Sequence, residues 1–208
     1  MDVFNGSSNR PTNRPVITIK LASTSDEMMQ CFALRSAVYI GEQHCPYAEE
    51  FDGNDYTASH LILYVDGEPA SCMRLRWFGT FVKFERAVIL KRYRSMGLFV
   101  PFTQWAMEFA RKKGYSRVYL HSQHRLWPIM ERQGFRKVSE QIFNFSDHEY
   151  GAYYIDLEVD AKTAPSMHTD PLVLNRPEDQ LDIPGILERS AERGATNPHA
   201  EWTERRPN

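Results

Sequence analysis

The sequence has little cysteine and no long apolar segment. Its three cysteines, Cys31, Cys45 and Cys72, are scattered and none forms a CxxC pair. An odd number of isolated thiols argues against a disulfide framework and a cysteine-based metal site, and it favours a reducing, cytoplasmic location. No apolar run is long enough to span a membrane, and residues 1–15 lack the apolar core of a signal peptide.

An excess of charge of one sign is also missing. The formal net charge is −2 over 208 residues, which gives no general reason to expect nucleic-acid or membrane binding. Hydrophobic residues make up 42% of the chain and aromatic residues 12%, enough for the core of one ordinary domain.

Proline and aromatic content divides the chain into three predicted parts. Residues 1–14 are polar and are expected to form a disordered leader, and residues 15–159 a folded domain. Residues 160–208 hold half of the prolines and a single aromatic residue, which predicts an extended tail with one short helix at 184–191. Such a tail could wrap the domain or pair two copies as a homodimer.

Hydrophobic periodicity predicts the order of elements in the domain. Three strands precede one β–α–β unit, and an antiparallel pair follows, with Asp66-Gly67 as a hairpin signal. The fold class is therefore α+β, a mostly antiparallel mixed sheet with helices on both faces. Strands are predicted at 16–21, 60–65, 70–78, 81–90, 117–121, 135–145 and 149–159, and helices at 28–39, 98–113 and 126–133.

The turn after the strand at 81–90 is the most informative feature. It contains Arg92, Arg94 and Gly97, and a helix is predicted to begin at Leu98. A strand, a glycine turn and a helix N-terminus together make a site where backbone N–H groups bind an anion.

This pattern resembles the GNAT family of acyl-CoA-dependent N-acetyltransferases, whose phosphate-binding turn is Q/R-x-x-G-x-G/A. Here the turn is Arg94-Ser-Met-Gly97-Leu-Phe99, in which Phe99 replaces the small last residue. Glu85-Arg-Ala-Val-Ile leads into it, and Glu131-Arg-Gln-Gly134-Phe135 resembles the family's late helix-to-strand turn.

The ElaA-like subgroup is the nearest within that family. Its motifs are similar to Arg35-Ser-Ala-Val-Tyr39, Glu50-Phe-Asp52-Gly-Asn-Asp55 and Leu120-His-Ser-Gln123. The resemblance covers residues 16–158.

The resemblance implies a binding site for acetyl-CoA as acyl donor and no metal. The pyrophosphate would lie on the turn, and backbone groups of the preceding strand would pair with the pantetheine arm, one of them polarising the thioester carbonyl. The implied cofactor-binding residues are Val88, Ile89, Arg94, Ser95, Met96, Gly97, Leu98 and Phe99.

Two catalytic residues are implied. Glu85 is the candidate base, and partial burial is expected to raise its pKa; the alternative is a structural salt bridge with Arg74, Arg76 or Arg86. Many family members use a tyrosine as general acid where this chain has Met130. His121 is the candidate substitute because histidine titrates near neutrality, unless it is a structural group or the thiolate leaves unprotonated.

Four residues are candidates for binding the acceptor. The acidic loop with Glu50 and Asp52 could attract a cationic amine, and Arg35 belongs to the same motif set. His148 lies in Asp147-His-Glu-Tyr150, which could line the substrate mouth. For the acidic loop the alternative is a solvated or arginine-paired loop, and for the His148 motif it is an ordinary hairpin turn.

Three functions fit the sequence. The first is acetyl transfer from acetyl-CoA to a primary amine of a small molecule or peptide. The second is long-chain acyl transfer, as in homoserine-lactone or N-acyl amino acid synthases, with an acyl carrier protein docked on residues 91–94. The third is a non-catalytic CoA-binding protein, to which Phe99 and Met130 would point.

Overall fold

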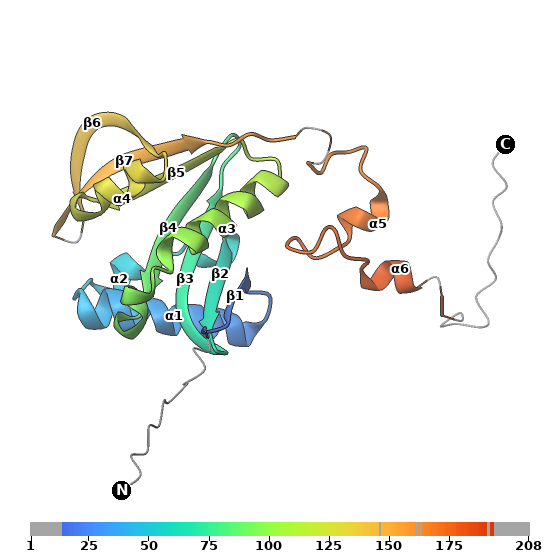
Figure 1. Ribbon diagram of the computed structural model, residues 1–208, viewed down its shortest axis with the longest axis horizontal. Coiled ribbons are helices and arrows are strands. Elements are labelled where there is room, and N and C mark those ends of the chain that lie inside the picture. Colours follow the sequence, from blue (N-terminus) through green and yellow to red (C-terminus); the bar gives the residue numbers. More distant parts are fainter. Residues whose placement is uncertain (1–13, 146, 161, 163, 191, 194–208) are drawn as a thin grey trace, which may run out of the picture.

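The computed structural model describes residues 14–145, 147–160, 162, 164–190 and 192–193, and their strands form one seven-stranded sheet (Figure 1). The strand order is β1-β2-β3-β4-β5-β7-β6, and the β4–β5 pair is parallel while the other pairs are antiparallel. The predicted mixed, mostly antiparallel sheet is confirmed. The strands are β1 (Ile17–Leu21), β2 (Ser59–Val65), β3 (Glu68–Trp77), β4 (Val82–Ile89), β5 (Arg117–Gln123), β6 (Arg136–Phe145) and β7 (His148–Asp156).

Helices cover both faces of the sheet, as predicted (Figure 1). The first begins at Ser25 because Thr24 and Glu27 form a capping box, and it continues into a π-helical turn. The segment that holds the acidic loop with Glu50 and Asp52 contains two short helical turns. The helical elements of the domain are α1 (Ser25–Arg35), η1 (Ser36–Glu42), α2 (Tyr47–Glu50), η2 (Asp55–Thr57), η3 (Lys91–Met96), α3 (Phe99–Lys112), η4 (His124–Leu126) and α4 (Trp127–Arg132).

The two faces carry separate hydrophobic cores. On one face α3 and α4 pack against the sheet, with Phe102, Ala106 and Phe109 of α3 buried. On the other face α1 contributes Cys31 and Leu34 to a smaller core. Alternating side chains of β2, β3 and β4 supply both cores.

A β-bulge interrupts β4. Arg74 of β3 lies opposite Glu85, but Cys72 lies opposite Val88, so β4 has one residue more than β3 between these pairs. Arg86 lies in this interval with a φ of +53°, a left-handed conformation that is strained for a non-glycine residue. Beyond the bulge Val88 packs in the α1 core, whereas Phe84 packs in the α3 core.

The C-terminal segment contains two short helices, α5 (Pro171–Leu174) and α6 (Ile186–Ser190). The sequence predicted α6 and missed α5. Residue 191, the last of the predicted helix, and residues 1–13 of the predicted leader lie outside the described residues. Lys113 forms an ion pair of 2.6 Å with Glu178, which connects the segment to the domain. Over the described part of the chain, no helix combines the length and apolar character that crossing a membrane requires.

Candidate active site

The parallel strands β4 and β5 separate part-way along their length. They pair only from Val82–Val118 to Phe84–Leu120, after which β5 continues to pair with β7. The opening between the separated ends holds a cavity of about 130 Å³, called here the splay cavity. Strand separation therefore creates the site, and the bulge at Arg86 lies on its β4 side.

Apolar side chains form much of the splay cavity wall. Phe99 of α3 and Met130 of α4 both line the cavity and pack against the main core. The two residues that depart from the family pattern therefore narrow the cavity and also support the fold.

A second, larger cavity of about 310 Å³ lies toward the β6–β7 hairpin and is called the hairpin cavity. Five residues line both cavities, which makes them parts of one depression: Tyr39, Glu85, Arg86, His121 and Tyr150. The structure thus brings the two predicted catalytic residues, Glu85 and His121, together.

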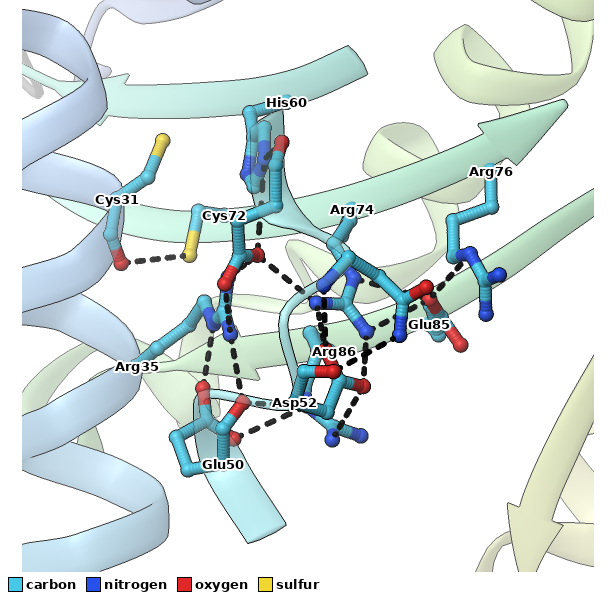
Figure 2. A network of polar contacts seen from close by, with 12 residues as sticks. Cys31, Arg35, Glu50, Asp52, His60, Cys72, Arg74, Arg76, Glu85 and Arg86 are labelled. Carbon is cyan, nitrogen blue, oxygen red and sulfur yellow. Dashed lines mark hydrogen bonds and ion pairs between the residues drawn. The ribbon is translucent and has the colours of Figure 1, made fainter. Parts of the chain in front are cut away.

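A network of ion pairs extends from the hairpin cavity into the α1 core (Figure 2). Arg74 is fully buried and lies between the loop and β4: it donates to Asp52 at 2.7 and 2.8 Å, to Asp55 at 2.8 Å and to Glu85 at 2.9 Å. Arg86 donates to Asp52 at 3.1 Å and to the Glu49 carbonyl at 2.6 Å. The acidic loop is thus paired with arginines, which is an alternative to its predicted role in binding the acceptor.

The burial of Arg35 and Glu50 contradicts the prediction that they contact the acceptor substrate. Their side chains are 0% and 1% exposed, and Arg35 donates to both Glu50 and Asp55. A residue without accessible surface cannot touch an acceptor, so both hold the loop against the domain. Asp52 is 28% exposed and lines the hairpin cavity, and it alone of the three lies within reach of a bound molecule.

Glu85 does not have the raised pKa that the sequence predicted. Burial does raise the pKa of this carboxyl, but the hydrogen bond from Lys83 at 2.9 Å and the charges of Lys83 and Arg74 outweigh it, and the pKa lies below its ordinary value. Glu85 is therefore ionised at neutral pH.

His121 does not titrate near neutrality. Burial, reinforced by the positive charge of Lys83, lowers its pKa to about 4. Its Nε2 lies 2.8 Å from the Tyr119 hydroxyl, and its ring packs edge-on against Phe143. A neutral imidazole has no acidic proton to give a thiolate, so the general-acid role loses its basis.

The anion turn is a 3₁₀ helix, η3, that ends at Gly97 with a φ of +68°. A Cβ at Gly97 would meet no atom of the described residues within 4 Å, and the N-cap residue of α3, Leu98, makes no capping hydrogen bond with its side chain. Ser95 and Met96 are exposed, whereas Leu98 is buried in the core. Arg94 is already paired with Glu42 at 2.6 Å, so backbone groups rather than its guanidinium are left for an anion.

The carbonyls of Val88 and Ile89 have partners within the chain. Ser71 donates to the first at 2.6 Å and Arg94 to the second at 2.9 Å. That this end of β4 pairs with a pantetheine arm stays a prediction, and we expect its backbone N–H groups to make that pairing.

His148 is exposed at the start of β7, opposite Phe145, and it lines neither cavity. Tyr150 of the same motif lines both. Among the residues that the structure describes, no three His, Cys, Asp or Glu side chains are grouped as metal ligands.

Sequence reasoning missed the cavity-facing roles of Tyr39, Arg76 and Lys83. A signal for the last two was present. Arg74 and Arg76 share one face of β3, Lys83 and Glu85 share the same face of β4, and the short turn at 78–81 sets their register.

The model of the acetyltransferase (GNAT) family matches residues 25–135. This chain belongs to the GNAT acetyltransferase family. The matched segment runs from α1 through Phe135 and includes β4, β5 and the anion turn, and the GNAT fold implies use of a CoA-linked acyl donor.

Relatives agree with this assignment. A Bacillus subtilis protein named as an acetyltransferase is 30% identical over 128 residues, which are 60% of this chain and 87% of the relative. The crystal structure of an acyl-CoA N-acyltransferase from Pseudomonas aeruginosa is 27% identical with a TM-score of 0.61, covering 67% of this chain and 98% of that one. Escherichia coli ElaA is 20% identical with a TM-score of 0.59 at 67% and 98% coverage, which shows a shared fold.

Proposed function

We propose that this GNAT protein is an N-acetyltransferase of the ElaA-like subgroup that moves an acetyl group from acetyl-CoA to a primary amine. The observation that carries the proposal is the splay cavity, which opens beside the anion turn and continues into a second cavity lined by Glu85. A donor and an acceptor can thus meet at one carboxylate.

The anion turn fits the pyrophosphate of CoA. The uncapped N-terminus of the 14-residue helix α3 has N–H groups that no side chain of its N-cap satisfies. The open space at Gly97 lets a phosphate approach the backbone closely. Residues 95–99 would hold the phosphates, and the thioester that CoA supplies is the group to be transferred.

The size of the splay cavity supports a short acyl group. Its volume is about 130 Å³, and Phe99 and Met130 bound it. A long acyl chain would have to displace these core side chains, which is costly in a packed interior. Acetyl transfer is therefore favoured over the long-chain alternative.

Proton and bond changes balance around Glu85. The acceptor nitrogen attacks the thioester carbon, so a C–N bond forms while the C–S bond breaks and sulfur leaves with the electron pair. An ammonium acceptor loses two protons in all: one ends on sulfur and one goes to solvent. Glu85 is ionised and accepts a nitrogen proton, directly or through water, as the nitrogen becomes more acidic during attack.

Tyr150 replaces His121 as the candidate proton donor to sulfur. Its hydroxyl lines both cavities and accepts a hydrogen bond of 3.0 Å from Gln123. Since the hydroxyl oxygen is the acceptor there, its own proton remains available.

A thiol-release assay with acetyl-CoA and longer acyl-CoAs over an amine library tests the proposal. Acetyl-CoA should be used best, and Glu85→Gln should lower kcat about 10²- to 10⁴-fold with little change in the affinity for acetyl-CoA. Glu68→Gln, the same change at an exposed position of β3, serves as the matched control.

Phe99→Ala sharpens the assay by widening the splay cavity, and it should improve use of the longer donors. Absence of thiol release with every donor and amine would overturn the proposal in favour of a non-catalytic CoA-binding protein. Three further statements stay predictions: that the protein forms a homodimer, that an acyl carrier protein docks on it, and that it is located in the cytoplasm.

A further inference from the structure

The charged groups of the hairpin cavity do not match a cationic acceptor. Three cations line it, Arg76, Lys83 and Arg86, against two carboxylates, Asp52 and Glu85. Across the whole ion-pair network there are five arginine or lysine side chains for four carboxylates. The cavity therefore presents an excess of positive charge.

Both carboxylates are already engaged. Asp52 accepts hydrogen bonds from Arg74 and Arg86, and Glu85 accepts them from Arg74 and from Lys83. Burial raises the pKa of each, but these arginine and lysine partners lower both pKa values below the ordinary range. The negative charge of each carboxylate is therefore already balanced by neighbouring cations.

Arg76 is the cation with spare hydrogen-bonding capacity. Its guanidinium, 28% exposed, donates no side-chain hydrogen bond to any residue that the structure describes; its nearest carboxylate oxygen, on Glu85, is 3.8 Å away, and it lies over the ring of Phe78. Figure 2 places it at the edge of the network beside Glu85. A guanidinium has five N–H donors in a planar fork that matches a carboxylate.

The register of the sheet brings a second cation to the same place. Arg76 of β3 lies directly opposite Lys83 of β4. Like charges at directly opposed positions destabilise a sheet. Glu85 offsets part of this repulsion, and a further anion bound between the two cations would offset the rest.

We propose that the acceptor is an amine that also carries a carboxylate, as an amino acid does, and that Arg76 and Lys83 bind that carboxylate. This rests on the proposed acetyl transfer and specifies its substrate class. The rings of Phe143 and Tyr150, stacked at 6.0 Å, offer an apolar wall of the same cavity for the acceptor's side chain.

The same cations assist the chemistry. A positive charge near an ammonium group lowers its pKa, so a larger fraction of bound acceptor is the neutral amine that can attack. Such an acceptor can lose its proton to a weaker base, which agrees with the lowered pKa of Glu85.

Calorimetry on the full chain tests the proposal without requiring turnover. The probes are amino acids, each paired with the amine that remains when its carboxylate is removed, such as phenylalanine and phenethylamine. The amino acid should bind about 10- to 100-fold more tightly than its amine, as expected for charge-assisted hydrogen bonds. Arg76→Gln should remove most of this ratio, Arg76→Lys should keep part of it, and Arg76→Glu should invert it.

Arg117→Gln is the matched control, because Arg117 lies on β5 outside both cavities and pairs with Asp156. It should leave the ratio unchanged. Equal binding of acid and amine, no binding of the amino acids, or an unchanged ratio in a folded Arg76→Gln variant would each overturn the proposal. Thiol release measured in parallel separates the two ideas: an amino acid that binds but is never acetylated contradicts acetyl transfer and not carboxylate recognition.

Discussion

The two faces of the sheet are built from different interactions. Under α3 and α4 lies the larger hydrophobic cluster, and the buried polar residue that α3 adds to it is the uncharged Thr103. Under α1 a smaller apolar cluster lies beside Arg35, Glu50, Asp55, His60 and Arg74, all buried. Apolar burial is non-directional, whereas buried ion pairs fix orientation. The α3 face therefore supplies cohesion, and the α1 face positions Glu85 and Asp52 at the cavity.

Breaking the charged face should have the largest effect. Arg35→Met leaves Glu50 and Asp55 buried with fewer partners, which should reduce the free energy of unfolding by about 3–5 kcal/mol. Denaturant unfolding measures this as a lower midpoint. The exposed Arg132→Met is the control and should change stability by less than about 0.5 kcal/mol. A loss below about 1 kcal/mol in Arg35→Met would mean that the network is not stabilising.

Breaking the apolar face should cost slightly less and leave the site intact. Leu61 is fully buried in the main cluster, and Leu61→Ala should reduce the free energy of unfolding by about 2–5 kcal/mol. Activity per folded molecule should stay at the wild-type level, whereas Arg35→Met should lower it. If Leu61→Ala lowers activity per folded molecule as strongly as Arg35→Met does, the inference that the α3 face supplies cohesion while the α1 face positions the site is wrong.

A smaller change tests how α1 is fixed over the charged face. Thr24 caps α1 and forms a reciprocal pair with Glu27, so Thr24→Ala should reduce the free energy of unfolding by about 1 kcal/mol. Thermal unfolding measures the change, with the exposed turn residue Thr80→Ala as the control. An effect no larger than that of Thr80→Ala would show that the cap contributes nothing.

The last expected effect is a dependence of stability on pH. The pKa of His121 is about 4 in the fold and about 6.5 in an unfolded chain. Between these values the unfolded chain binds more protons, so stability is fully present above pH 6.5 and falls as the pH falls toward 4. His121→Gln should flatten this part of the curve of unfolding free energy against pH. A curve that keeps its wild-type shape would contradict the low pKa.

The sequence predicted the strands, the main helices and the anion turn because these depend on local patterns. Asp66-Gly67 marks its hairpin, and Gly114 and Gly134 end α3 and α4 with positive φ. The resemblance also predicted Glu85 and His121 as site residues, and both line the splay cavity.

The failures concern burial and long-range partners. A buried arginine such as Arg35 has the same letter as an exposed one, and its partners are 15 and 20 residues away. The pKa values of Glu85 and His121 depend on Lys83, whose side chain reaches both only after β4 and β5 are aligned. Periodicity carries no such information.

The bulge in β4 separates what the fold needs from what the site needs. Val88 packs in the α1 core and Phe84 in the α3 core. Deleting Ala87 would leave both valine and phenylalanine on their present faces, because regular alternation would then give the same result. The chain would lose the left-handed Arg86 and the local bend beside the splay cavity. The extra residue thus shapes the splay cavity and is not needed to place Val88 and Phe84 on their faces.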